Sequence, residues 1–334
     1  MTKFLIIRFS SIGDILQCMR VIDDILQHFP DAQIHWVTRR DMAPLLRADR
    51  RLRAVWELDR ESGLPGLLRL ARRLDAEHFD YLYDAHSNIR SAVIKSILLS
   101  PLKELLHRAP RHVARRKQRW KRFLLFRLRV NLFDKPFRGV YSYQKPLRSW
   151  GVARFDAPPP RWRFPPDYPS RLDPHFHPST ITLVPSANWT LKRWPVAHWQ
   201  ELVRLMPSHH FLLLAGPRDA FCDEIRSVAP LRVTNLAGAT TLLESCYLIS
   251  RSRLVISADT GLLHAADLFD IPCLALIGPT AFGFPSGPRS EVIEAPLPCR
   301  PCTKDGRGHC RRPLSCMEEI TPARVAARAR ALVH

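Results

Sequence analysis

Three segments of the chain carry a charged side chain where an apolar, strand-like run gives way to a helix-like one. The first is the run Ser-Ser-Ile-Gly-Asp at residues 10–14. A glycine beside a carboxylate at the carboxyl edge of a strand places an acid at the mouth of a cleft, and the adjacent helix N-terminus supplies amides and a positive dipole. The structural alternative is that Asp14 caps a helix beginning near Ile15, because Asp is a preferred N-cap residue.

The second segment spans Trp189 to Pro195 and holds Lys192 between two tryptophans. It follows a strand-like run and precedes a helix-like one. An ammonium group in that position is placed to meet a phosphate as a point charge. The alternative is a surface lysine beside tryptophans that belong to the core.

The third segment is the strongest local signal in the sequence. A strand-like run ends in Asp259, Thr260 and Gly261 and passes into an apolar helix with His264 in its first turn. Free amides at Thr260 and Gly261 could hold phosphate oxygens, and Asp259 could accept hydrogen bonds from sugar hydroxyls. A helix cap formed by Asp259 or Thr260 is again the structural alternative.

A cluster of cysteines lies near the end of the sequence, with the spacing C-x2-C-x7-C-x5-C. The first pair has the spacing of a zinc ribbon, the second pair is more widely spaced, and His309 is a fifth candidate ligand. Two interpretations stay open: a structural zinc ion, or a loop of free thiols. Four thiolate ligands would leave no open position, so we assign the cluster no catalytic role. Its members are Cys299, Cys302, Cys310 and Cys316.

The chain is strongly basic, with 51 Lys and Arg against 31 Asp and Glu and a formal net charge of +20. Such a charge attracts polyanions, whether nucleic acid, an anionic membrane or a phosphorylated glycolipid. Cations concentrate in residues 103–148 among aromatic and aliphatic side chains, which predicts a basic amphipathic helix or helix pair. A solvated helix face is the alternative. The candidate acceptor or membrane contacts are Arg115, Arg116, Lys117, Arg119, Lys121 and Arg122.

These side chains must be positioned by the elements around them, and 334 residues suffice for two α/β domains. Strand-like and helix-like runs alternate in both halves, which predicts right-handed crossovers and parallel sheets. Strands are predicted at 3–8, 33–38, 53–58, 81–85, 180–184, 211–215, 254–257 and 273–277. Helices are predicted at 12–29, 39–46, 64–74, 195–206, 220–228, 241–250, 262–269 and 321–333.

The domain boundaries follow from the proline-rich stretch 158–178, which is unsuited to regular structure and is interpreted as a linker. We predict an acceptor-binding domain over 1–157 and a nucleotide-sugar-binding domain over 179–318. A final basic helix in 319–334 is expected to pack back on the first domain. No apolar stretch is long enough to span a bilayer and the N-terminus does not read as a signal peptide, so we expect a cytoplasmic protein.

Taken together, the segments resemble glycosyltransferase family 9, the ADP-heptose:lipopolysaccharide heptosyltransferases. Each run is short, but they recur in the family's order and at similar spacing over nearly the whole chain. The matching runs are 10–14, 189–195, 259–264, 276–280, 299–302 and 316–317.

This resemblance implies a GT-B fold, with two Rossmann-like domains whose parallel sheets face each other across a cleft. It also implies an inverting transfer that requires no metal or other cofactor. Asp14 then corresponds to the catalytic base and Lys192 to the residue that neutralises the donor's phosphates. The implied donor-binding loop consists of Asp259, Thr260, Gly261 and His264. Support in the first turn is assigned to Ser10, Ser11 and Gly13.

The function implied is transfer of heptose from ADP-heptose to the lipopolysaccharide inner core, on Kdo-lipid A or a core heptose. The basic segment would then hold an anionic glycolipid acceptor and keep the enzyme on the inner face of the inner membrane. One alternative is a family 9 transferase with another nucleotide sugar or a protein acceptor. A more distant one is a non-catalytic nucleic-acid-binding protein. No helix-turn-helix, RNA-recognition or finger signature supports it, so no specific nucleic acid is expected as a partner.

Overall fold

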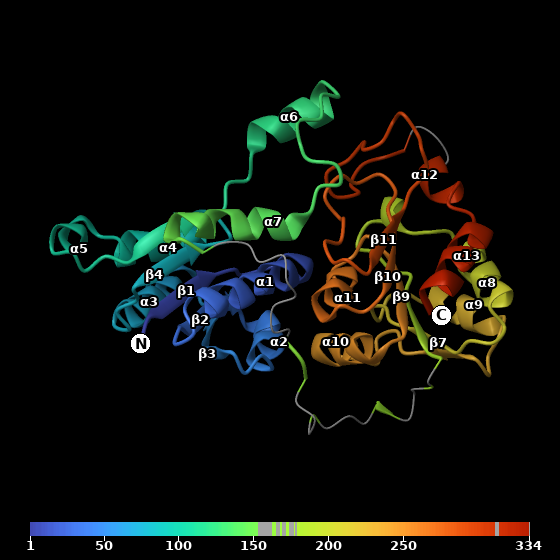
Figure 1. Ribbon diagram of the computed structural model, residues 1–334, viewed down its shortest axis with the longest axis horizontal. Coiled ribbons are helices and arrows are strands. Elements are labelled where there is room, and N and C mark those ends of the chain that lie inside the picture. The colour runs from blue at the N-terminus through green and yellow to red at the C-terminus, as the bar shows by residue number, and fades with distance from the viewer. Residues whose placement is uncertain are drawn as a thin grey trace. The chain divides into compact units, whose positions relative to one another are not determined.

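The computed structural model describes residues 1–152, 162–164, 168, 172–173, 177, 179–310 and 314–333. The chain divides into two compact units (Figure 1). Unit 1 comprises Met1–Gln118 and Val140–Phe164, and unit 2 comprises Arg119–Gly139 and Pro165–His334. Of the 21 residues of the predicted linker, 158–178, 14 lie outside the described residues.

Unit 1 is built on a five-stranded parallel sheet of order β3-β2-β1-β4-β5. Its central strand β1 pairs with a neighbour on each side, so that Ile7 lies opposite both Val37 and Asp84. The strand order changes direction between β1 and β4, which is the place where open α/β sheets bind ligands. The strands are β1 (Lys3–Ile7), β2 (Gln33–Arg39), β3 (Leu52–Leu58), β4 (Tyr81–Asp84) and β5 (Arg111–Ala114).

The strands β1, β2 and β4 are buried along almost their whole length, which requires helices over the sheet of unit 1. On one face, Leu5 and Ile7 of β1 share a buried cluster with Leu70 and Leu74 of α3 and Ile94 of α4. Both faces of a parallel sheet are normally covered by its crossovers. The helices are α1 (Ile12–His28), α2 (Ala43–Arg47), α3 (Gly63–Asp75), α4 (Ile89–Leu98), α5 (Pro101–Leu105) and α7 (Gly139–Gln144), with 3-10 turns at Arg40–Met42 and Lys145–Trp150.

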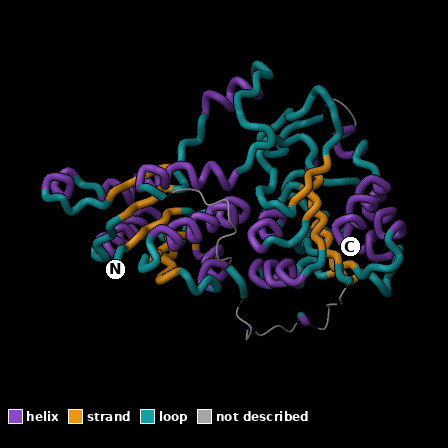
Figure 2. Tube along the Cα trace, in the orientation of Figure 1, coloured by secondary structure: helices purple, strands orange, loops and turns teal. Residues whose placement is uncertain are grey.

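Unit 2 is built on a six-stranded parallel sheet of order β11-β10-β9-β6-β7-β8, drawn in orange in Figure 2. Here the direction of the strand order changes between β6 and β9, so the turns that follow these two strands meet at one edge. The strands are β6 (Ile181–Val184), β7 (Phe211–Leu213), β8 (Val233–Asn235), β9 (Leu254–Ala258), β10 (Cys273–Leu276) and β11 (Ser290–Ile293).

The helices of unit 2 include the last one of the chain, α13, which packs on α8 and on β9 and β10. Its apolar residues Val325, Ala329 and Val333 belong to the core of this unit. This packing differs from the expected packing of 319–334 on the first domain, because the apolar stripe of the helix completes the second core. The helices are α6 (Arg119–Arg127), α8 (Val196–Leu205), α9 (Phe221–Ser227), α10 (Leu242–Arg251), α11 (Leu263–Phe269), α12 (Ser315–Glu318) and α13 (Pro322–Val333), with a 3-10 turn at Thr190–Lys192.

The basic segment 103–148 forms the expected basic helix only over α6 and is not one continuous helix or helix pair. It contributes the edge strand β5 to unit 1, then α6 to unit 2, then α7 to unit 1. The excursion 119–139 joins unit 2 because Phe133 and Phe137 pack against Phe282, with ring centroids 5.1 and 5.0 Å away. Within the described residues, no helix has both the length and the apolar character that a membrane span requires.

Candidate active site

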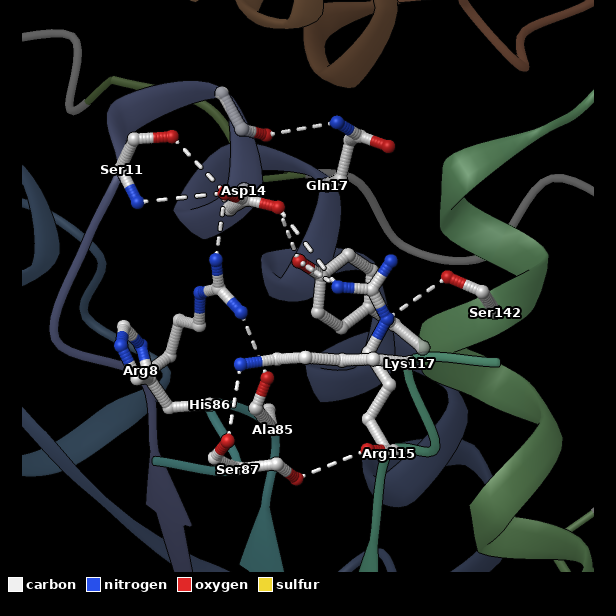
Figure 3. A network of polar contacts seen from close by, with 12 residues as sticks. Arg8, Ser11, Asp14, Gln17, Ala85, His86, Ser87, Arg115, Lys117 and Ser142 are labelled. Atoms are coloured by element: carbon white, nitrogen blue, oxygen red, sulfur yellow. Dashed lines mark hydrogen bonds and ion pairs between the residues drawn. The ribbon is translucent and has the colours of Figure 1, made fainter. Parts of the chain in front are cut away.

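The carboxylate of Asp14 lies in the first turn of α1, directly after the central strand β1 (Figure 3). The helix begins at Ile12 with Ser11 as its N-cap, so Asp14 is not the cap of a helix starting near Ile15. Ser11 instead donates to Asp14, from its hydroxyl at 2.9 Å and from its amide at 3.4 Å. The turn thereby fixes the carboxylate at the carboxyl edge of the sheet.

Two arginines and a tyrosine surround this carboxylate. The Arg8 guanidinium lies 2.6 Å from Asp14 Oδ2 and also donates to the carbonyl of Ala85, at the end of β4. Arg115 Nη1 lies 3.8 Å from Oδ1, and the Tyr143 hydroxyl donates to Oδ1 at 2.6 Å. The residues that directly follow β1, β4 and β5 therefore meet Asp14 of α1 and Tyr143 of α7 at the point where the strand order changes direction.

These neighbours keep Asp14 ionised. Burial on its own would raise the pKa of Asp14, but Arg8, the Tyr143 hydroxyl and Arg115 outweigh it and hold the pKa well below the usual carboxyl range. The side chain still retains 35% of its exposure, whereas that of Arg8 retains 6%. An approaching hydroxyl group can therefore reach an anionic oxygen whose counter-ions are already fixed in place.

Arg115 and Lys117 belong to this neighbourhood and are not free surface cations. Arg115 donates to Ser142 Oγ at 2.9 Å and to the Tyr143 hydroxyl at 2.8 Å, with its guanidinium 3.8 Å from the centroid of the Tyr143 ring. Lys117 Nζ donates to the carbonyl of Ser87 at 2.9 Å, next to His86. Both were predicted as acceptor or membrane contacts, and the structure ties them to the sheet edge that carries Asp14.

We expect the His86 imidazole to stay neutral until the pH falls to about 4. Burial, followed by the positive charges of Arg8 and Lys117, lowers the pKa of His86 to about 4. The unfolded chain takes up this proton near pH 6.5, so folding stability should fall as the pH drops from 6.5 towards 4. An NMR titration of the imidazole C2 proton of His86, assigned with the variant His86→Gln, measures this pKa. A midpoint near 6.5 would contradict this electrostatic picture of the site.

In unit 2, the segment that carries Lys192 contacts the segment that carries Asp259. Neither segment of the sequence predicts this contact on its own. Lys192 Nζ lies 3.1 Å from Asp259 Oδ2, with side-chain exposures of 14% and 11%. Thr280, after β10, donates its hydroxyl to the same oxygen at 2.5 Å. Gly283 passes so close that a Cβ there would lie 2.2 Å from Asp259 Oδ1. The turns after β6, β9 and β10 thus enclose one ion pair at the carboxyl edge of the second sheet.

The remaining residues of the predicted donor loop follow Asp259 directly. Thr260 and Gly261 are half-buried, and the amide of His264 donates to the carbonyl of Gly261 at 3.2 Å. The helix α11 begins at Leu263 with Leu262 as its N-cap, so neither Asp259 nor Thr260 caps it. His264 is buried, with 5% exposure.

Arg8, Tyr143 and Asp219 are site residues that the sequence analysis did not single out. Asp219 accepts from the Ser186 hydroxyl at 2.5 Å and lies 3.1 Å from Arg193, beside the turn that carries Lys192. The only sequence signal for Arg8 is an arginine at the end of a buried strand, since a buried arginine requires an acidic partner. Nothing local in the sequence points to Tyr143, which lies 129 residues from Asp14.

The four late cysteines line one small cavity of about 90 Å³, together with His309. Burial raises the pKa of Cys316 to about 11, and burial, Cys299 and Cys310 raise that of Cys302. Across the described part of the chain, no three His, Cys, Asp or Glu side chains are grouped as a metal ion would hold them. The cavity brings the thiols together without supplying a formed metal site.

Comparison with known proteins identifies the family to which this chain is similar. The model of glycosyltransferase family 9 (heptosyltransferase) matches residues 67–309. Lipopolysaccharide heptosyltransferase 1 of Pseudomonas aeruginosa is 24% identical, over 90% of this chain and 86% of its own length.

Two solved structures share the fold over almost their whole length. The E. coli ADP-heptose lipopolysaccharide heptosyltransferase II superimposes with a TM-score of 0.73 at 22% identity, over 99% of this chain and 98% of that one. E. coli heptosyltransferase WaaC with ADP-2-deoxy-2-fluoro heptose gives a TM-score of 0.68 at 19% identity, over 99% of each chain. These likenesses confirm the predicted GT-B fold class.

The family match covers well over half of the chain, and it includes the turns that carry Lys192 and Asp259. The prediction of a transferase is thereby confirmed, and the interpretation as a non-catalytic nucleic-acid-binding protein is not supported. The chain is a glycosyltransferase and belongs to glycosyltransferase family 9.

Proposed function

We propose that this enzyme transfers heptose from ADP-heptose to the lipopolysaccharide inner core, on Kdo-lipid A or a core heptose, with inversion at the anomeric carbon. The observation that carries the proposal is the carboxylate of Asp14, which is ionised and partly exposed at the point where the strand order of the first sheet changes direction. The lipopolysaccharide heptosyltransferase named above, and the solved structure with an ADP-heptose analogue, support the choice of donor and acceptor.

In the proposed reaction, Asp14 takes the proton of the acceptor hydroxyl as its oxygen attacks the anomeric carbon. The bond from that carbon to the diphosphate breaks, and ADP leaves with the electron pair. A positioned carboxylate contributes about 10²–10⁴-fold to such a step. Because the pKa of Asp14 is low, proton transfer is favoured only late, when the attacking hydroxyl has become strongly acidic.

The second unit is proposed to hold the donor. The Lys192 ammonium group and the amides of Thr260 and Gly261 would stabilise the charge that develops on the leaving diphosphate. Asp259 holds Lys192 at 3.1 Å before the donor arrives, so the cation is already ordered. We propose that this fixed charge serves in place of a metal ion and that the transfer requires no cofactor.

For the cysteine cluster, the structural zinc ion stays a prediction. The shared cavity of Cys299, Cys302, Cys310 and Cys316 supports it, whereas the absence of an assembled ligand group among the described residues does not. Elemental analysis of protein purified without chelator tests it. About one zinc per chain is the expected result if the ion is present, and its complete absence would leave reduced thiols.

We further propose that the enzyme acts in the cytoplasm, as a peripheral protein on the inner face of the inner membrane, where an anionic glycolipid acceptor would be available. The net charge of +20 supports attraction to such a surface.

The experiment that tests the proposed function combines a donor panel with two acceptors. ADP, UDP and GDP are titrated calorimetrically, and radiolabelled ADP-heptose is then offered with water-dispersed Kdo-lipid A or with its heptosylated product. Selective ADP binding and transfer to one of the two acceptors are expected. Transfer from another nucleotide sugar, or only to a protein acceptor, would overturn the assignment of substrates while leaving the enzyme class intact.

A further inference from the structure

Five large apolar side chains are exposed within the short segment 119–132. Trp120 and Phe123 of α6 are each 59% exposed, and Leu128, Val130 and Leu132 in the following loop are also exposed. Trp120 and Phe123 lie three residues apart and share one face of the helix with Arg127. Contiguous exposed apolar groups on a soluble protein mark a binding surface.

The opposite side of the segment is firmly attached to unit 2. Leu125 is buried, and the rings of Phe126 and Phe133 pack edge-on against Phe282 with centroids 6.0 and 5.1 Å away. The Arg129 guanidinium donates to the carbonyl of Pro301 at 2.8 Å. The exposed face is therefore presented by an anchored element and is not the frayed end of a loop.

Cations flank the exposed apolar groups. Arg119 and Arg127 are exposed, and no hydrogen bond or ion pair engages either guanidinium within the described residues. Lys121 is held back, because its Nζ donates to the carbonyl of Leu132 at 3.0 Å, and Arg122 lies 4.7 Å over the Phe282 ring. Over residues 119–139 the sequence contains a single acidic side chain, Asp134. The surface is thus complementary to an anionic partner.

We propose that residues 119–132 dock the enzyme on an anionic lipid bilayer, with Trp120 and Phe123 entering the interface and Arg119 and Arg127 contacting lipid phosphates. This inference rests on the proposed function, which places the acceptor in a membrane. Trp and Phe beside Arg are the composition of helices that lie in the plane of a membrane interface. The nine residues of α6 extend only about 13 Å, so the helix rests on the bilayer and does not cross it.

The test is co-sedimentation of the full-length protein with vesicles of phosphatidylethanolamine and phosphatidylglycerol, and with vesicles of phosphatidylcholine alone. We expect binding to the anionic vesicles that weakens with salt, and at least about 10-fold weaker binding for the pair Trp120→Ser and Phe123→Ser. Arg119→Gln with Arg127→Gln should weaken binding by a similar factor. The matched control is Leu231→Ser, which removes a leucine of unit 2 that is 93% exposed and lies outside any helix, beside Arg232, whose guanidinium donates to backbone carbonyls.

A second readout separates this proposal from the proposed function. Heptose transfer to a delipidated, water-soluble acceptor should be unchanged in the Trp120 and Phe123 variant. No binding of the wild type to anionic vesicles, or equal binding of wild type and variant, would overturn the docking element. Loss of transfer to the soluble acceptor in the variant would overturn it too, by showing a role in catalysis. Absence of transfer by the wild type would instead count against the proposed function alone.

Discussion

We expect Asp14→Asn to lower the turnover number for heptose transfer by about 10²–10⁴-fold while the affinity for ADP stays nearly unchanged. Asparagine keeps the shape of the side chain, but its one amide oxygen can accept on only one of the two sides that Tyr143 and Arg8 occupy, and it cannot take up the acceptor's proton. Asp14 belongs to unit 1, whereas the turns that we propose to bind the nucleotide belong to unit 2. The measurement is steady-state transfer of labelled heptose, with ADP affinity from calorimetry.

Two further variants make this prediction specific. Asp24→Asn is the matched control, because it removes another carboxylate of α1, which is buried and accepts from Gln144 at 2.8 Å. It should retain the wild-type turnover number. Tyr143→Phe removes the hydroxyl that donates to Asp14 and should slow transfer only on the order of 10-fold, while moving the acid limb of the pH profile upwards. Retained turnover in Asp14→Asn would refute the base assignment.

The second large effect is expected for Lys192→Ala, which should lower transfer by about 10²–10³-fold and weaken ADP binding, because it removes a fixed charge from the leaving diphosphate. Affinity for adenosine, which has no phosphate, should not change. Calorimetry with both ligands separates the phosphate contact from a general loss of the pocket.

Its matched control is Lys304→Ala, which removes an equal charge from an exposed position in the same unit. The control variant should bind ADP as the wild type does. Equal losses of ADP and adenosine affinity in Lys192→Ala would mean that Lys192 acts only as the structural counter-ion of Asp259. Unchanged ADP binding would remove Lys192 from the donor site altogether.

Local patterns in the sequence were enough to predict most of the elements that carry the site. The helix predicted over 12–29 spans Ile12–His28, and the strand predicted over 254–257 spans Leu254–Ala258. These elements have strong periodicity or continuous apolar runs, so short-range information defines them. The edge strand β5, Arg111–Ala114, was missed because its basic, half-exposed residues carry no such run.

The sequence by itself therefore determined the two parallel α/β units and the turns that bear Asp14, Lys192 and Asp259. Only the tertiary structure decided which charges meet. Strand order brings Arg8, Arg115 and Tyr143 around Asp14 and joins Lys192 to Asp259, and that order depends on pairing between strands far apart in the chain. Local periodicity reports which face of an element is buried, and it contains no information about which neighbour covers it.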